Sequence, residues 1–330
     1  MFDTRKADLL RGRSAQVERV AGRERGAAER GLHRQTFSNA YLNVEIVSGK
    51  RGGVARFDWN DRGRWASVFR RAHGQGDRPG FGPLSCYPLI QIADPGNAIR
   101  TSALPRGVAL PDRMTNPVEG ACALPGEDWT VDVVEEKMVR LKAACTDLYR
   151  ASQTYWIDGP TLEMTVEVEN MSPGSLACGI GIHPVIVRDP DTWLSAPASG
   201  LWIEGRAGQS AGFIPTPSPW QFGVTYPLPA TKIDHAFTGW GGKTLVEWPA
   251  RQFSLVIEAN TDSYRLHAVP GEDSFSFEVA NDRAESCRVQ DAGDLCGLTV
   301  LAARETLMRR TRFAVERLGS LTRTARKPSK

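Results

Sequence analysis

The chain has 330 residues, of which 41% are hydrophobic and 24% charged, and its formal net charge is +3 at pH 7. This composition is that of a globular protein with a buried core, and no apolar run approaches the roughly 20 residues of a membrane-spanning helix. The first residues are charged and contain no apolar segment typical of a secretory signal. The six cysteines are scattered without a CxxC pair. We therefore expect a cytosolic (cytoplasmic) protein with reduced thiols, no membrane association and no bound metal.

The positive charge lies at the two ends of the chain. Residues 1–35 contain nine Arg and Lys against five Asp and Glu, and residues 320–330 add four positive charges and no acid. Subtracting +4 and +4 from the whole-chain +3 leaves −5 for the middle, so nucleic-acid binding by the core is not expected. We predict a basic arm at 1–37, either weakly helical or disordered, and a disordered basic tail at 319–330.

Between these ends, short segments alternate apolar and polar residues with the period of two that is typical of β-strands. In 161–170, Leu162, Met164, Val166 and Val168 share one face, and acidic residues and threonine occupy the other. The predicted strands are 41–48, 53–59, 129–136, 138–146, 161–170, 253–260, 263–270, 274–281, 297–303 and 311–318.

No long amphipathic helix pattern follows residue 40. Many short strands without intervening helices predict an all-β fold, an antiparallel β-sandwich over residues 38–318. The segment 189–232 is rich in Pro, Gly and Ser, and we predict long loops there that cross the sandwich and help to form a pocket.

The stretch "GIGIHPVIV" (179–187) places one of only five histidines inside an apolar run, directly before a proline. Such an imidazole is either a packed core group or a proton donor that faces a pocket. The sequence pattern alone leaves both alternatives open.

Several stretches, in the same order along the chain, resemble the aldose 1-epimerases (galactose mutarotases). "GIGIHPVIV" resembles the Gly-x-Gly-x-His-Pro segment of that family. Residues 166–173 resemble the strand and Asn turn before it, 233–249 the Asp-bearing segment, and 275–315 the closing segment with its Glu. The resemblance extends over about residues 38–318.

The resemblance implies a galactose mutarotase-type β-sandwich (supersandwich) with a sugar-sized cleft. In that family a general base removes the proton of the anomeric hydroxyl while a general acid protonates the ring oxygen, and neither a metal nor an organic cofactor is needed. By match to the family motifs, Glu278 is the base, His183 is the acid and Asp234 holds sugar hydroxyls.

The residues support these roles on physical grounds as well. In 274–281, Phe275 and Phe277 share one face and Glu278 lies on the other, where an ionised carboxylate can accept a proton. An imidazole is mostly neutral at pH 7, so His183 needs a nearby carboxylate to supply a proton. The alternatives are a solvated Glu278 on a polar strand face and a turn-capping Asp234.

The sequence departs from the family pattern at three positions. Glu119 occupies the place of an expected second histidine, and Asp94 with Pro95 the place of an Asn-Arg pair. Asp282 lies where another histidine is common. We expect Glu119, Asp94 and Asp282 to contact the substrate, and acidic replacements favour a polyol, an amino sugar or a cationic ligand over a phosphosugar.

Aromatic and histidine side chains in the second half of the chain are further candidates. Tryptophan can stack on the C–H face of a sugar, and Trp240 is the preferred ligand contact. His235 is expected on the opposite face from Asp234, and His267 is expected in packing or on the surface. The other tryptophans of this part of the chain are Trp193, Trp202 and Trp220.

Two functions from different classes follow. The first is an isomerase that interconverts the anomers of an aldose or related cyclic hemiacetal in carbohydrate metabolism. The alternative is a carbohydrate- or metabolite-binding module, or a repurposed proton-transfer enzyme, on the same fold without mutarotase turnover. The expected partner in both is a small carbohydrate or polyol-like ligand.

Overall fold

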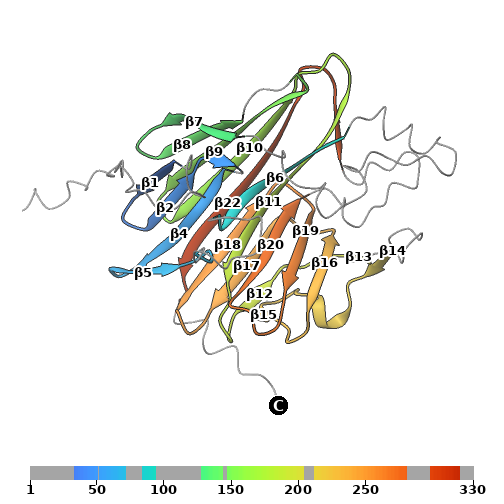
Figure 1. The fold of residues 1–330 in the computed structure, drawn as a ribbon. Coiled ribbons are helices and arrows are strands. Elements are labelled where there is room, and N and C mark those ends of the chain that lie inside the picture. Colours follow the sequence, from blue (N-terminus) through green and yellow to red (C-terminus); the bar gives the residue numbers. More distant parts are fainter. Residues whose placement is uncertain are drawn as a thin grey trace, which may run out of the picture.

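The structure is a computed structural model that describes residues 33–50, 52–71, 84–93, 128–143, 147–203, 212–280 and 298–319. Within these ranges nearly all regular structure is antiparallel β-strand, arranged in two twisted sheets that pack face to face (Figure 1). No helix of the described residues is long and apolar enough to cross a membrane. A single 3₁₀ turn occurs in these ranges, at Ser218–Trp220.

The first sheet, sheet A, contains 12 strands among the described residues. Its order is β1-β2-β4-β6-β11-β20-β19-β16-β13-β14, with β5 paired to β4 and β21 paired to β11. Its strands are β1 (Arg34–Ser38), β2 (Leu42–Val47), β4 (Gly53–Asp61), β5 (Arg64–Ser67), β6 (Cys86–Ala93), β11 (Leu176–Val187), β13 (Gly200–Ile203), β14 (Gly212–Pro215), β16 (Ile233–Thr238), β19 (Ser263–Ala268), β20 (Ser274–Ala280) and β21 (Thr299–Leu301).

The second sheet, sheet B, contains 10 strands in the described part of the chain, in the order β15-β12-β17-β18-β22-β10-β9-β8-β7-β3. Its strands are β3 (Gly49–Lys50), β7 (Asp128–Val134), β8 (Met138–Ala143), β9 (Tyr149–Asp158), β10 (Thr161–Asn170), β12 (Trp193–Ser195), β15 (Tyr226–Pro227), β17 (Lys243–Trp248), β18 (Phe253–Ala259) and β22 (Thr306–Arg317).

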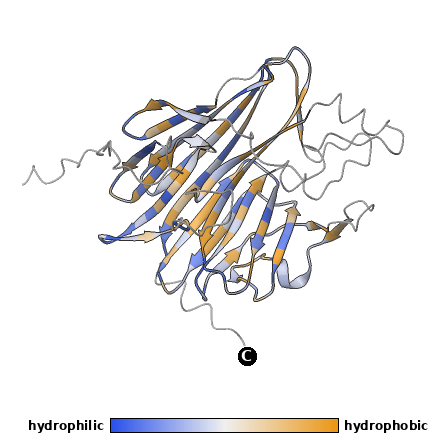
Figure 2. Ribbon diagram, viewed as in Figure 1, coloured by the Kyte–Doolittle hydropathy of each residue, from blue (hydrophilic) through white to orange (hydrophobic). Residues whose placement is uncertain are grey.

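The core fills the space between the two sheets. Alternate residues of each strand point inward, so hydrophobic and hydrophilic bands alternate along the ribbons (Figure 2). Phe57 on β4 and Phe69, which follows β5 and bridges to β11, meet Phe313 of sheet B at ring-centroid distances of 6.4 and 5.1 Å. Full burial of a large apolar side chain stabilises the fold by about 1.5–3 kcal/mol, and these contacts hold the sheets together.

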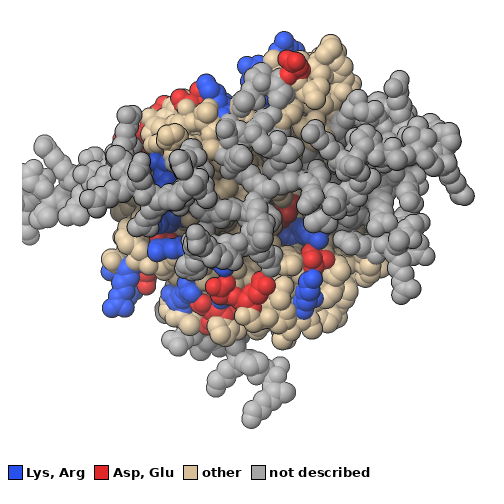
Figure 3. Space-filling view, in the orientation of Figure 1, with Lys and Arg blue, Asp and Glu red and all other residues tan. Residues whose placement is uncertain are grey.

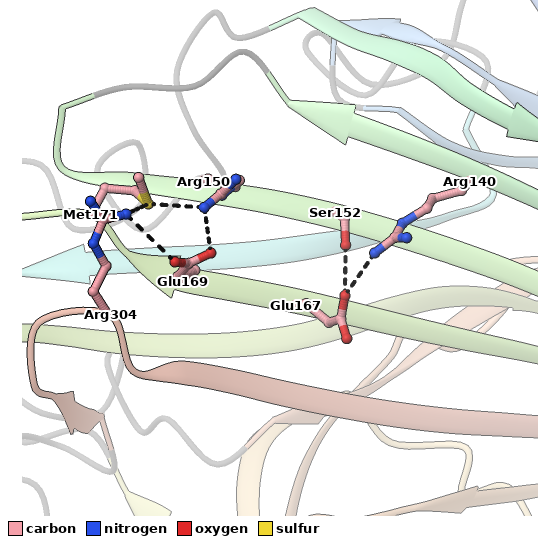
Figure 4. A network of polar contacts seen from close by, with 7 residues as sticks. All are labelled: Arg140, Arg150, Ser152, Glu167, Glu169, Met171 and Arg304. Carbon is pink, nitrogen blue, oxygen red and sulfur yellow. Dashed lines mark hydrogen bonds and ion pairs between the residues drawn. The ribbon is translucent and has the colours of Figure 1, made fainter.

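The outer face of sheet B is polar. Glu167 on β10 accepts hydrogen bonds from Ser152 on β9 (2.9 Å) and from Arg140 on β8 (3.2 Å), and Glu169 pairs with Arg150 at 2.8 Å (Figure 4). Exposed pairs of this kind contribute little stability each. They mark this face as solvent-facing, in agreement with the period-two pattern of 161–170.

Asn170, the last residue of β10, joins this strand to the β21–β22 turn. Its side-chain amide donates to the backbone carbonyls of Gly174 (2.8 Å), Leu301 (3.0 Å) and Ala302 (3.1 Å). Its Oδ1 accepts from the backbone N–H and the hydroxyl of Ser172. The side chain is fully buried with both polar atoms bonded, which fixes three chain segments relative to one another.

The structure confirms the antiparallel sandwich and corrects one prediction about its course. The segment 189–232 is not simply loops: it contributes β12 and β15 to sheet B and β13 and β14 to sheet A. These strands are two to four residues long, too short to show a period of two among Pro and Gly. Strand β1 begins at Arg34, within the range 1–37 predicted as an arm; residues 1–32 and 320–330 lie outside the described residues.

Candidate functional site

Polar side chains gather on the face of sheet A that points away from sheet B, which we call the site face. In β20, Phe275, Phe277 and Val279 are buried in the core between the sheets. Successive residues of a strand point to opposite sides, so Ser276 and Glu278 lie on the site face. The same alternation acts in the neighbouring strands β11, β19 and β16.

His183 on β11 lies directly opposite Glu278 on β20. The flanking pairs Ile182↔Val279 and Val185↔Ser276 set this register. The imidazole Nδ1 is 3.0 Å from Glu278 Oε2, which is hydrogen-bond distance. The two side chains are 21% and 15% exposed, so they contact each other in a largely desolvated place.

A tyrosine fixes the imidazole from the other side. Tyr87 on β6 is the register partner of His183, and the two rings stack with centroids 4.9 Å apart and an interplanar angle of 23°. Tyr87 is buried and belongs to a small apolar cluster with Val47, Ala55 and Leu84. His183 is thereby held between a ring and a carboxylate, and its orientation is defined by both.

One atom of each group in this pair remains available. The Nδ1–Oε2 contact does not use the second polar atom of each side chain, His183 Nε2 and Glu278 Oε1. No hydrogen bond to either atom occurs among the described residues. An ionised carboxylate only accepts hydrogen bonds, whereas an imidazole nitrogen donates or accepts according to its protonation. The pair therefore leaves one carboxylate oxygen and one imidazole nitrogen for contact with another molecule.

Gly181 makes room for the carboxylate. It lies two residues before His183 and therefore on the same face of β11. A Cβ atom at this position would lie 3.2 Å from Glu278 Oε1 and 3.2 Å from the Cβ of Ala280. The close approach of Glu278 explains the glycine in the "GIGIH" stretch, because a side chain there would press on the carboxylate.

Asp234 lies in β16 and not in a turn, so the turn-capping alternative does not apply. Arg265 on β19 donates to Asp234 Oδ1 from Nε (3.1 Å) and Nη2 (2.8 Å). His267 Nδ1 is 3.3 Å from Oδ2, and Lys232 Nζ is 3.8 Å from the same oxygen. The hydrogen bond with His267, followed by the charge of and hydrogen bonds from Arg265, holds the pKa of Asp234 well below its usual range, against the opposing effect of burial.

The His183–Glu278 pair and the cluster around Asp234 are neighbours on the site face. Strands β11, β20, β19 and β16 are adjacent in sheet A, and Arg265 is the register partner of Glu278. Adjacent strands are about 4.8 Å apart, so the four strands bring His183, Glu278, Arg265 and Asp234 into one patch. The structure therefore brings together the three residues assigned from the family motifs.

The charges of this patch nearly balance. It contains two carboxylates, one guanidinium and two imidazoles, with a lysine at its border. In the wider view of Figure 3, acidic and basic side chains are interspersed over the visible described surface and form no extensive field of one sign. Such a site suits a ligand with little net charge.

The pKa of Asp234 predicts a pH-dependent stability. Because the folded-state pKa of Asp234 is lower than the ordinary value of about 3.9, Asp234 stabilises the fold fully above that value, and this contribution is lost as the pH falls from there through the folded-state pKa. Asp234→Asn should lower the free energy of unfolding by about 1–3 kcal/mol at pH 7. The difference from wild type should shrink below about pH 4 in denaturant titrations. A difference that stays constant from pH 7 to pH 3 would contradict the assignment.

Of the remaining predicted site residues, three lie outside the described ranges and Trp240 lies in the core. Glu119, Asp94 and Asp282 lie outside the described residues. Trp240 is 3% exposed and packs edge-on against Tyr264 and Phe277 in the core. The indole N–H of Trp240 donates to a backbone carbonyl. This placement corrects the prediction of a stacking contact with ligand, because the ring is enclosed by protein.

The candidate side chains His235 and Trp202 lie on opposite faces of sheet A. His235, as predicted, points to the opposite face from Asp234 and contacts Trp220 at a ring-centroid distance of 5.2 Å. Trp202 on β13 lies on the site face, because its neighbour Leu201 is fully buried in the core. Its ring is 5.6 Å from that of Phe213, which is largely exposed.

Sequence reasoning missed Arg265 and His267, the second of which was expected in packing or on the surface. A signal was present: in β19, Tyr264 and Leu266 alternate with these two polar residues. The pattern places Arg265 and His267 on the same face but does not say which strands lie beside β19. The register Asp234↔His267 and Glu278↔Arg265 supplies that information.

The chain is similar to one curated protein and to several solved structures. No protein-family model matches it. The uncharacterized protein YphB of Escherichia coli K12 is 32% identical over 231 residues, which cover 68% of this chain and 76% of YphB.

Solved structures with the same fold include a putative aldose 1-epimerase from Escherichia coli K12, with a TM-score of 0.67 at 23% identity over 87% of this chain and 100% of that one. The galactose 1-epimerase from Lactobacillus acidophilus NCFM has a TM-score of 0.63 at 14% identity, with 92% and 99% coverage. A GalM/aldose epimerase homologue from C. elegans has a TM-score of 0.63 at 11% identity, with 84% and 97% coverage. At these identities the structural matches establish the fold.

Proposed function

Because the chain belongs, as a divergent member, to the aldose 1-epimerase (galactose mutarotase-like) family, we propose that it interconverts the anomers of an aldose or related cyclic hemiacetal. The reaction needs one group that accepts a proton and one that donates a proton across a single ring. The observation that supports it most directly is the contact of 3.0 Å between Glu278 and His183 on the site face. The ligand is a small carbohydrate or polyol-like molecule of low net charge.

The two available atoms of the pair define the proposed steps. Glu278 Oε1 takes the proton of the anomeric hydroxyl while His183 Nε2 gives a proton to the ring oxygen. The bond between the anomeric carbon and the ring oxygen breaks, and a carbonyl forms at the anomeric carbon. Rotation of this carbonyl followed by the reverse proton transfers closes the ring as the other anomer.

The reverse proton transfers restore the pair. After ring opening Glu278 Oε1 holds the proton of the anomeric hydroxyl, and the ring oxygen holds the proton from His183 Nε2. On closure Glu278 returns its proton to the carbonyl oxygen and His183 takes one back from the former ring oxygen, so no external acid or base is consumed, while the Nδ1–Oε2 hydrogen bond keeps the two side chains in place. Asp234, ionised and held by Arg265 and His267, accepts hydrogen bonds from other hydroxyls of the sugar and positions the ring.

The test is exchange NMR on equilibrated sugars, with the rate of anomer exchange measured for D-galactose, D-glucose, D-mannose and D-xylose. Acceleration by the wild-type chain and its loss in Glu278→Gln would support the proposal. Glu136→Gln, an exposed change in the β7–β8 turn of sheet B, is the matched control and should behave as wild type. Saturable binding with equal, uncatalysed exchange in all three proteins would favour the binding module instead.

Substitution of Gly181 should reduce activity without unfolding the chain. In Gly181→Ala the new methyl group pushes the Glu278 carboxylate by a few tenths of an ångström, and about a tenfold loss of kcat/KM is expected, with a larger loss for valine. The melting temperature should change by only a few degrees in the alanine variant, because the preference for alanine over glycine in a strand interior offsets the close contact with the Cβ of Ala280. Gly174→Ala, where the new Cβ meets no atom within 4 Å, is the control. Full activity in both Gly181 variants would contradict this role.

A further inference from the structure

His267 is a second imidazole on the site face. The inward residues of β19, Tyr264 and Leu266, are fully buried, so Arg265 and His267 point to the opposite side. His267 is the register partner of Ser276 on β20 and of Asp234 on β16. Glu278 lies two residues beyond Ser276 and is therefore its diagonal neighbour, at a Cα separation of about 7–8 Å.

Asp234 fixes the orientation of the His267 ring. The depressed pKa of Asp234 keeps it ionised, so its oxygens only accept hydrogen bonds. Arg265 occupies Oδ1, and Nδ1–H of His267 donates to Oδ2. The hydrogen bond from Nδ1–H to Asp234 thus fixes the tautomer and the orientation of the ring. In histidines that contact a ligand through one nitrogen, the hydrogen bond of the other nitrogen commonly has this effect.

The opposite nitrogen of His267 lacks a partner. Nε2 is buried and forms no hydrogen bond within the described part of the chain, although 24% of the side chain is exposed. A buried polar atom without a partner is costly and calls for an explanation, such as a group that binds there. A group of a bound molecule would supply the missing partner.

We propose that His267 Nε2 binds a hydroxyl group of the sugar remote from the anomeric carbon, while Asp234 holds the imidazole through Nδ1 in addition to its own contact with the sugar and Arg265 holds Asp234. A hydroxyl suits this atom because it can donate to a neutral imidazole or accept from a protonated one. The carboxylate of Asp234 offsets the cations beside it, so a neutral hydroxyl fits better than a phosphate. This inference rests on the proposed function and adds to it the residue that discriminates between sugars by a hydroxyl group.

Two substitutions separate substrate contact from a structural role. His267→Asn keeps a nitrogen near the place of Nδ1, which holds Asp234, and removes the Nε2 position. His267→Gln places an amide nearer to Nε2 and loses the contact with Asp234. We expect His267→Asn to raise KM for the accelerated aldose about tenfold with little change in kcat, and His267→Gln to raise KM less.

Deoxy sugars then identify the hydroxyl. For the monodeoxy derivative that lacks the contacted hydroxyl, wild type and His267→Asn should have equal KM values, because each then lacks the same hydrogen bond. If His267→Asn leaves KM unchanged and only His267→Gln raises it, the role of His267 is to hold Asp234 and the inference is overturned. Equal sensitivity to all deoxy derivatives would overturn it as well.

A readout without turnover distinguishes this inference from the proposed function. The imidazole nitrogen resonances of His267, assigned in ¹⁵N-labelled protein by comparison with His267→Asn, are followed as D-galactose or D-glucose is added. A saturable shift of Nε2 larger than that of Nδ1 supports the contact even if no anomer exchange is accelerated, in which case the epimerase proposal alone fails. Accelerated exchange without any shift of Nε2 overturns the contact and leaves the epimerase proposal intact.

Discussion

Replacing Glu278 by Gln is expected to slow anomer exchange by about 10²–10⁴-fold, and adding His183→Gln should slow it little further. The amide introduced at position 278 keeps the size of the carboxyl group but accepts a proton far less readily. Each single variant removes one half of the proposed acid–base pair, whose two side chains are joined by the 3.0 Å hydrogen bond. Groups that act as one unit lose most of their effect with the first substitution.

The measurement is a double-mutant cycle on kcat/KM from exchange NMR, with four proteins at one pH. Losses that multiply in the double variant would show that the two residues act independently and would contradict the proposal that they act as one acid–base pair. The free energies of unfolding of the four proteins should agree within about 1 kcal/mol, since both side chains are partly exposed and are replaced by amides of similar size. A large loss of stability would point instead to a structural role for the pair.

Asn170→Asp is expected to lower the free energy of unfolding by about 4 kcal/mol, although the two side chains have the same shape. The wild-type amide donates to three backbone carbonyls in a fully buried place. A carboxylate has no hydrogen to donate, so it would place an unpaired negative charge against three carbonyl oxygens. The free energy of unfolding falls for two reasons, because the three carbonyls lose their hydrogen bonds and because a charge is buried.

Guanidinium denaturation at pH 7 measures this loss. Asn260→Asp is the matched control, because Asn260 is exposed and its Oδ1 accepts a hydrogen bond from the backbone N–H of Arg310, which a carboxylate oxygen can accept equally well. The control should change stability by less than about 0.5 kcal/mol. Equal effects of the two substitutions would show that burial and hydrogen bonding at Asn170 are not what holds the β21–β22 turn.

The strands could be predicted where one face is exposed to solvent and the other is buried. Strand β10 shows this most clearly, because four apolar residues alternate with acidic residues and threonine. Strand β9 was missed, because its inward positions include the small Ala151 and the polar Gln153 while the exposed Trp156 lies on its outer face. Hydrophobic alternation fails when the core is filled by small or hydrogen-bonded side chains, and such positions are recognised only with the packing in view.

The site was predictable in part for a similar reason. Glu278 and His183 stand in stretches with a recognisable order of residues, and the register of β11 and β20 brings them together. Arg265 and His267 have no motif of their own, and their role depends on which strands lie on either side of β19. That neighbourhood is a property of the assembled sheet, because β16 and β20 approach β19 from different parts of the chain.

The donor and acceptor of the site stand on the paired strands β11 and β20, whose backbone hydrogen bonds fix the spacing between them. Inserting a single residue into either strand ahead of the pair would turn one of the two groups into the core. Changes in the length of the connecting loops leave this spacing untouched. The loops can therefore differ in length while the spacing of the proposed acid–base pair stays the same.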